Sequence, residues 1–152
     1  MLRSKNIIAS KFVEIIEENQ QVITEKYMND LLRNPDTVAY RKLDRHDIYE
    51  SGNRIYRELS KWIVKDLPKK DIEKYYYKLG KERVAQGVPF TQAHKALVLQ
   101  RRHLWLFIRD RIASEEAHYP EIIELNNRVV TYFDRATMFL LAAYEDYIYK
   151  KW

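Results

Sequence analysis

Glycine and proline are rare in this chain, and their scarcity restricts most strongly what it can fold into. Of 152 residues only three are Gly and four are Pro. They stand between long segments in which apolar residues recur at steps of three and four, the period of one helix face, and no segment shows the alternation of a half-buried strand. The sequence therefore predicts an all-α protein, a bundle of about five or six helices with a long C-terminal helix.

The breaks in this pattern divide the chain into its expected helices. The first ends before Asn34-Pro35, because a residue that precedes proline disfavours the helical conformation. Asp44 is a candidate N-cap for the second helix. In the third helix Arg83 shares a face with apolar residues, and Gly80 allows a close approach of another helix. The expected helices cover residues 4–33, 44–66, 70–86, 91–113 and 120–147.

A sharp corner between the third and fourth helices carries the clearest local signals. Gly87 is placed to end a helix, because glycine adopts the left-handed conformation without a steric penalty. Pro89 then prevents the helix from continuing. We expect Thr91 to cap the next helix, with Phe90 lying against that helix. The helix that follows has apolar residues on nearly every side, which predicts that it is buried among neighbours.

The last helix suggests contact with a second copy of the chain. At about 28 residues it would be about 42 Å long, which exceeds the width of a small domain. Two parallel rows of apolar residues run along it, and two rows imply two packing partners. The alternative is that one monomeric bundle buries both rows. The residues predicted for a dimer seam between the first and last helices are Phe12, Ile16, Val129, Phe133, Ala136, Leu140, Ala143 and Tyr147.

Length and composition fit one domain covering residues 1–152. The chain is 46% hydrophobic and 32% charged, too apolar for a disordered protein and too charged for a membrane protein. No apolar run approaches the roughly 18 residues of a membrane span, and no signal-peptide core opens the chain, so we expect a cytoplasmic protein. The sequence contains no cysteine, which excludes disulfides and thiolate chemistry in this chain.

No constellation for catalysis or metal binding is evident, and we expect neither an enzyme nor a cofactor. Glycine-rich phosphate loops and the common hydrolase and metalloprotease motifs are missing. Glu115 and His118 have the spacing of one half of a di-iron site, but such a site needs a second copy of the motif. His103, on an apolar helix, is the nearest candidate for a haem ligand. The alternative for His103 is a hydrogen-bonded or surface histidine.

Charge gives a weak indication of partners. The formal net charge is +5, and the basic residues concentrate between residues 78 and 111, next to an acidic last third. Because such segments can pair with each other, the net charge alone does not indicate nucleic acid. Arg102, Trp105 and Arg109 share a helix face that suits phosphate, so a small nucleic-acid-binding regulator is an alternative. The many tyrosines and tryptophans also supply material for a ligand pocket between helices, without indicating the ligand.

The central stretch resembles a known family. The matching elements are Gly80–Arg83, Gln86–Thr91, Ala96-Leu97 and Leu104-Trp105, which must all keep their spacing. Together they are similar to the N-terminal sensor domain of RsbR-type proteins (RsbRD N-terminal), found in bacteria ahead of STAS or histidine-kinase modules. The similarity covers residues 5–149.

This resemblance implies a globin-like fold without haem and dimerisation through terminal helices. It also implies a non-enzymatic role in stress-response or two-component signalling, in which the domain passes a signal to a C-terminal output module or partner protein. The sequence carries no such module after Trp152, so we expect either an excised sensor or a stand-alone one. Two alternatives to this interpretation remain. One is a haem-binding globin that senses a gas, and the other is the nucleic-acid-binding regulator.

Overall fold

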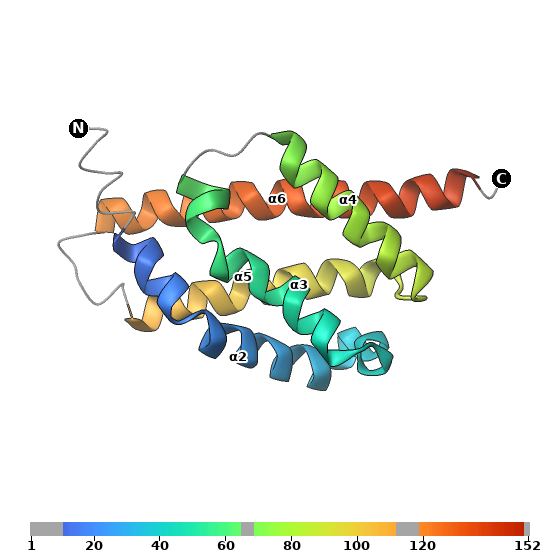
Figure 1. Ribbon diagram of the computed structural model, residues 1–152, viewed down its shortest axis with the longest axis horizontal. Helices are drawn as coiled ribbons and strands as arrows, with labels where there is room; N and C mark the ends of the chain where they lie inside the picture. Colours follow the sequence, from blue (N-terminus) through green and yellow to red (C-terminus); the bar gives the residue numbers. More distant parts are fainter. Residues whose placement is uncertain (1–10, 65–68, 112–118, 151–152) are drawn as a thin grey trace.

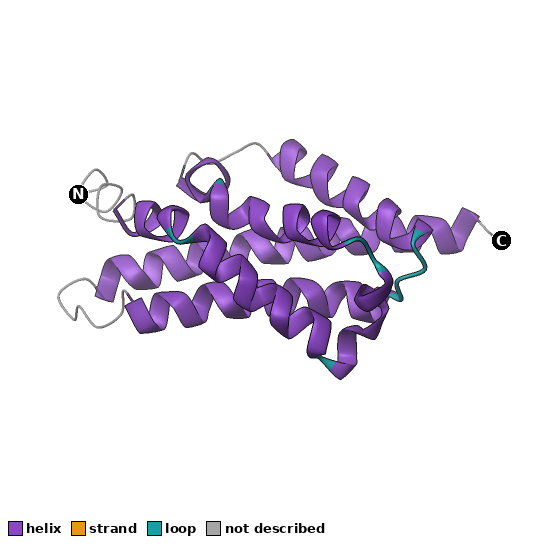
Figure 2. Ribbon diagram, turned by 60° about the horizontal axis from the view of Figure 1, so that its bottom comes forward, coloured by secondary structure: helices purple, strands orange, loops and turns teal. Residues whose placement is uncertain are grey.

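The computed structural model describes residues 11–64, 69–111 and 119–150, and for residues 63 and 64 the backbone alone. Within these ranges the regular elements are helices and no strand occurs (Figure 2), which confirms the predicted all-α fold. None of the described helices is long and apolar enough to cross a membrane. The elements in chain order are a helical segment at residues 11–18, α2 (Gln20–Arg33), the 3-10 helix η1 (Pro35–Lys42), α3 (Arg45–Arg57), the π-helix η2 (Ser60–Val64), α4 (Lys69–Ala85), α5 (Phe90–Arg111) and α6 (Tyr119–Lys150).

Helix α6 is the longest described element and runs along the long axis of the bundle (Figure 1). Its 32 residues correspond to a length of about 48 Å. It packs against α4 and α5. The first of the two predicted apolar rows is buried from Val129 to Ala143, whereas most of the second row is only partly buried. The buried residues of α6 are Ile122, Leu125, Val129, Tyr132, Phe133, Ala136, Phe139, Leu140, Ala143 and Tyr144.

The contact between α4 and α6 depends on a glycine. A Cβ atom added at Gly80 would lie 2.5 Å from the carbonyl oxygen of Leu140 and 2.7 Å from the Cβ of Ala143. Both distances are shorter than van der Waals contact, so a larger residue would push the two backbones apart. The close approach predicted for Gly80 is confirmed.

The first predicted helix is interrupted. Residues 4–10 lie outside the described part of the chain, and the helix that covers residues 11–18 ends at Asn19. The Asn19 side chain donates a hydrogen bond of 2.7 Å to the carbonyl of Ile15. An asparagine that bonds a backbone carbonyl in this way competes with helical hydrogen bonding. The prediction of one continuous helix up to Arg33 was therefore wrong, because a separate helix, α2, begins at Gln20.

The second predicted helix is also divided. Asp44 caps α3 as expected, since its carboxylate accepts a hydrogen bond from the amide of Asp47. The helix ends at Arg57, well before the expected Asp66. A carboxylate from outside the helix contributes to this break, because Glu17 accepts 3.0 Å hydrogen bonds from both the amide and the hydroxyl of Ser60. The π-helix η2 begins at that serine.

The corner between α4 and α5 is largely as predicted. Gly87 has a φ of +76°, and its amide donates to the carbonyl of Val84. The next amide, of Val88, donates to the carbonyl of Arg83, and these two bonds form the Schellman motif that ends many helices. The cap assigned to Thr91 was wrong. Helix α5 already begins at Phe90, and the carbonyl of Pro89 accepts the amides of the first turn.

Helix α5 passes through the bundle with one face buried and one exposed, so the expectation of burial on nearly every side was too strong. The exposed face includes His94 and Trp105. Phe90 is also largely exposed, and its ring contacts that of Tyr144 on α6. Ile112, expected on the apolar face, lies outside the described residues. The buried residues of α5 are Ala93, Ala96, Leu97, Leu99, Gln100, Leu104 and Ile108.

Replacing Gly80 by alanine should destabilise the protein by about 1–3 kcal/mol, because the added methyl group meets the α6 backbone. This loss should occur although alanine favours a helix over glycine by about 1 kcal/mol. Urea unfolding followed by circular dichroism measures the change. Lys81→Ala, on an exposed position of α4, is the control and should change stability by no more than about 0.5 kcal/mol. An unchanged or increased stability of Gly80→Ala would contradict the close contact.

Alkaline pH should unfold the protein through its buried tyrosines. Burial raises the pKa of the phenols of Tyr27, Tyr56, Tyr76 and Tyr132. In the unfolded chain these groups ionise near pH 10, so above about pH 10 the folded state binds more protons and stability falls as the pH rises. We expect their tyrosinate absorbance to develop together with the loss of helical circular dichroism. Complete tyrosine ionisation in a protein that keeps its helical signal would disagree with this burial.

Candidate functional site

A cavity of about 420 Å³ lies between α3 and α4. The two helices do not pack closely on each other as α4 and α6 do, and the cavity occupies the space between them. Its lining comes from residues at helical spacing on α3 and α4 and from the residue that follows α4. The lining residues are Asp47, Glu50, Ser51, Arg54, Arg57, Tyr75, Lys78, Leu79, Glu82, Arg83 and Gln86.

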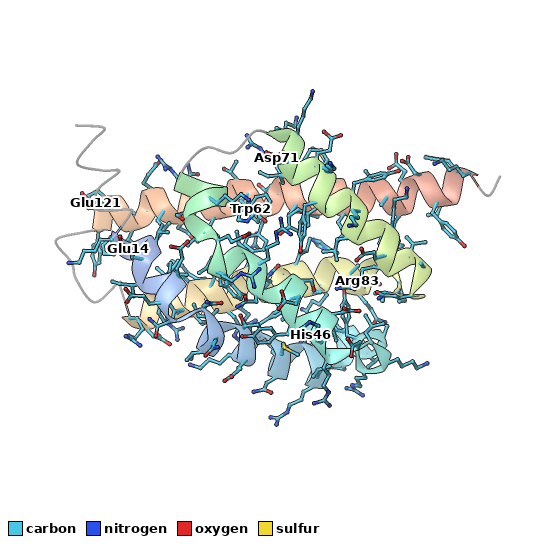
Figure 3. The ribbon with its side chains drawn as sticks, in the orientation of Figure 1. Glu14, His46, Trp62, Asp71, Arg83 and Glu121 are labelled. Carbon is cyan, nitrogen blue, oxygen red and sulfur yellow. The ribbon has the colours of Figure 1, made fainter. Side chains whose placement is uncertain are left out.

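Arg83 is the most unusual residue of this cavity. Its side chain comes from α4 and points into the molecule (Figure 3), where only 4% of the residue is exposed. One guanidinium nitrogen donates 2.8 Å to Gln86 Oε1, and the other donates 3.0 Å to Ser51 Oγ. The guanidinium also lies 5.5 Å from the ring centre of Tyr40. Burial raises the pKa of the Tyr40 phenol, and the nearby positive charge of Arg83 opposes part of that rise.

The cationic side chains around the cavity differ in how they are neutralised. Arg57 lies 3.5 Å from a carboxylate oxygen of Glu50, and Arg54 Nε lies at the same distance from Glu58. Lys78 and Arg83 have no carboxylate within ion-pair distance among the described residues. The cavity therefore carries two cations without a carboxylate partner, one of them buried.

Aromatic rings form one wall of the site. The Arg54 guanidinium stacks on Tyr75 at 4.2 Å from the ring centre and lies 5.3 Å from that of Trp62, and its Nε makes no hydrogen bond. An adjoining cavity of about 340 Å³ shares Arg54, Tyr75 and Lys78 with the first and adds Trp62. Charged and aromatic groups thus lie side by side over a continuous surface.

This wall is connected to the buried face of α6. The rings of Tyr75 and Tyr76 meet edge to face at 4.8 Å, and the hydroxyls of Tyr76 and Tyr132 are 2.5 Å apart. Tyr132, on α6, also contacts the ring of Trp62 at 5.9 Å. A change at the cavity wall can therefore reach α6 through direct contacts.

The last turns of α6 form a second candidate surface. Every described residue from 145 to 150 is exposed, and three of them are large apolar or aromatic side chains. Tyr147, Ile148 and Tyr149 are 49%, 47% and 70% exposed. The carboxylate of Asp146 accepts a hydrogen bond from Tyr77, which holds the start of this segment to α4. Trp152 lies outside the described residues.

The predicted dimer seam has a different environment from the one expected. Seven of its residues, Phe12, Ile16, Val129, Phe133, Ala136, Leu140 and Ala143, have exposed fractions of 3% or less within the single chain. They pack within the same bundle, where α4 and α5 lie against α6. Of the eight predicted residues only Tyr147 lies on the surface.

The predicted haem candidate is a hydrogen-bonded histidine. His103 Nε2 lies 2.8 Å from Oδ2 of Asp30 on α2, and the side chain is mostly buried. This contact occupies one of the two ring nitrogens that a metal could use. In the ranges that the structure covers, no group of three or more metal-ligating side chains is found. Glu115 and His118 lie outside those ranges.

The basic face considered for nucleic acid lies on the surface of α5. Arg102, Trp105 and Arg109 are all exposed there. Arg109 pairs with Asp110 at 2.8 Å, which neutralises part of this charge.

Sequence reasoning placed Arg83 on a helix face with apolar residues but missed the cavity. The signal it could have used is the run of charged residues at helical spacing along both α3 and α4. Spacing alone assigns such residues to a solvated face, however, and only the path of the chain shows that the two runs face each other.

The architecture is that of a small all-α domain with a charged cavity between two helices. A family model described as the RsbT co-antagonist protein rsbRD N-terminal domain matches residues 34–147. This match covers most of the chain, and the chain belongs to that family, which consists of regulatory sensor domains of the stressosome pathway. No curated protein and no solved structure matches. The family resemblance drawn from the corner region is confirmed.

The tyrosine pair between the cavity wall and α6 can be tested by a double-mutant cycle. Tyr76→Phe and Tyr132→Phe should each destabilise the protein by about 1–2 kcal/mol, because each leaves a buried hydroxyl without its partner. The double variant should lose less than the sum of the two. Urea unfolding gives the three values, and Tyr149→Phe, at an exposed position, is the control. Additive losses would show that the two hydroxyls do not interact.

Proposed function

We propose that this chain is a non-enzymatic sensor domain that dimerises and passes a signal through α6 to an output module or partner protein. The observation that carries the proposal is the position of α6. The helix contacts the cavity wall through Tyr132 and continues without a break to an exposed apolar end. A single helix thus joins a candidate ligand site to a candidate interaction surface.

The exposed end of α6 supports dimerisation through a new set of residues. A helix end that is apolar on its surface gains free energy when a second copy covers it. Tyr147 belongs to the seam predicted from the sequence, and Ile148 and Tyr149 extend the same surface. In this proposal the two copies meet at their C-terminal turns, while the buried face of α6 stays within each bundle.

The signal in this proposal is a shift of α6 relative to α4. Their contact at Gly80 leaves no free space, so the two helices cannot come closer together. When the cavity wall changes shape, they slide or tilt past each other as rigid bodies. The bond between Tyr77 and Asp146 joins them again near the C-terminal end. Output modules of the STAS or histidine-kinase type, implied by the family resemblance, would receive this movement through the end of α6.

Light scattering on the purified chain at tens of micromolar tests the dimer. We expect a dimer for the natural sequence and a monomer for Ile148→Glu, because the variant places a charge in the seam. Ile123→Glu is the matched control, since Ile123 is 68% exposed near the opposite end of the same helix. That control should remain a dimer. A monomeric natural chain, or equal effects of the two variants, would count against the proposed seam.

A further inference from the structure

We propose that the cavity between α3 and α4 binds a small monoanion through a carboxylate or a singly charged phosphate group, with Arg83 and Lys78 as its cationic contacts. This inference deepens the proposed sensor function, on which it rests, by naming the chemistry of the ligand. The body of the ligand would lie against the aromatic wall formed by Tyr75 and Trp62.

The first argument is the state of Arg83. Burying a cation without a compensating charge is unfavourable, and buried charges are normally paired. The side chains of Ser51 and Gln86, which accept hydrogen bonds from Arg83, are both neutral. The planar guanidinium is well suited to a two-oxygen group such as carboxylate or phosphate. An anion in the cavity would supply the negative charge that no described residue places beside Arg83.

The second argument is the charge of the whole lining. Four cationic and three anionic side chains surround the cavity, which leaves an excess of one positive charge. Glu50 is occupied by Arg57, whereas Asp47 and Glu82 are exposed residues of the lining. Carboxylates there repel anions of higher charge. A ligand with a single negative charge therefore fits the cavity best.

The third argument is size and surface. A volume of about 420 Å³ falls within the range of small-molecule sites, roughly 300–1,000 Å³. The adjoining cavity adds Trp62 to a surface that already contains Tyr75. Apolar or aromatic ligand atoms would be covered by these rings, while the anionic group reaches Arg83.

Nuclear magnetic resonance titration of the natural chain tests this inference directly. The probes are sodium benzoate, inorganic phosphate and benzamide, the last being a neutral molecule of nearly the same shape as benzoate. We expect benzoate to shift the Arg83 Nε–Hε and Trp62 indole signals to saturation, and benzamide or sodium chloride of equal ionic strength to leave them in place. Inorganic phosphate tests whether the natural ligand is organic or inorganic. If phosphate shifts the Arg83 signal and leaves the Trp62 signal in place, the ligand is inorganic.

Three variants locate the binding site. Arg83→Gln should abolish saturable benzoate binding, and Lys78→Gln should weaken it by about tenfold, the loss of one charge-assisted contact. Lys81→Gln is the matched control, because Lys81 is exposed on α4 and lines a different cavity. It should bind as the natural chain does. If Arg83→Gln does not fold, the Arg83 signal of the natural chain and the Lys78 variant decide the question.

Two results would overturn the inference: equal shifts by benzamide or chloride, or an equal weakening by Lys81→Gln and Lys78→Gln. The monomeric variant Ile148→Glu separates this inference from the proposed function. Its cavity is intact, so it should bind benzoate with unchanged affinity. If the natural chain itself is monomeric and still binds benzoate, the anion site stands and the proposed dimer seam falls.

Discussion

The close packing of α4 on α6 is the contact on which the rest of the structure depends. Gly80 lets the two backbones approach to a distance that no side chain would permit. Helix α6 then covers the core along its whole buried face, and the corner at Gly87 sends α5 back along it. The hydroxyl of Tyr144 on α6 donates to the carbonyl of Val88, which fixes this corner to the long helix. The contact at Gly80 and the turn at Gly87 thus set the orientation of α4, α5 and α6.

A tight contact on one side of α4 is matched by an open space on the other. Where α4 faces α3, charged side chains line a cavity, and a buried arginine lies there with no carboxylate partner among the residues that the structure describes. A protein optimised for stability alone would replace such a cation with an apolar residue. Its presence in this chain is consistent with a site that is completed by a ligand. Helix α4 therefore packs tightly against α6 on one side and lines a cavity toward α3 on the other.

The aromatic residues between these two faces give the proposed signal a physical route. Tyr75 belongs to the cavity wall, Tyr76 is its buried neighbour, and Tyr132 belongs to α6. Buried rings in contact cannot move independently, because interiors are packed as densely as organic crystals. A ligand that repositions the wall would therefore act on α6. The exposed end of that helix is where a partner would detect the change.

The sequence by itself determined the helical class, the corner and the family. Periodic apolar residues and sparse glycine specify helices, and Gly87 specifies a residue in the left-handed conformation. The spacing of residues around Gly87 identified the family. All three features depend on residues that are close together in the sequence. The sequence did not reveal the helix breaks at Asn19 and Ser60, where hydrogen bonds that involve side chains interrupt the helix. Only the tertiary structure determined that the apolar row of α6 from Val129 to Ala143 is buried within one chain and that charges on α3 and α4 line one cavity. Burial and facing surfaces depend on the path of the whole chain, which a helical period does not contain.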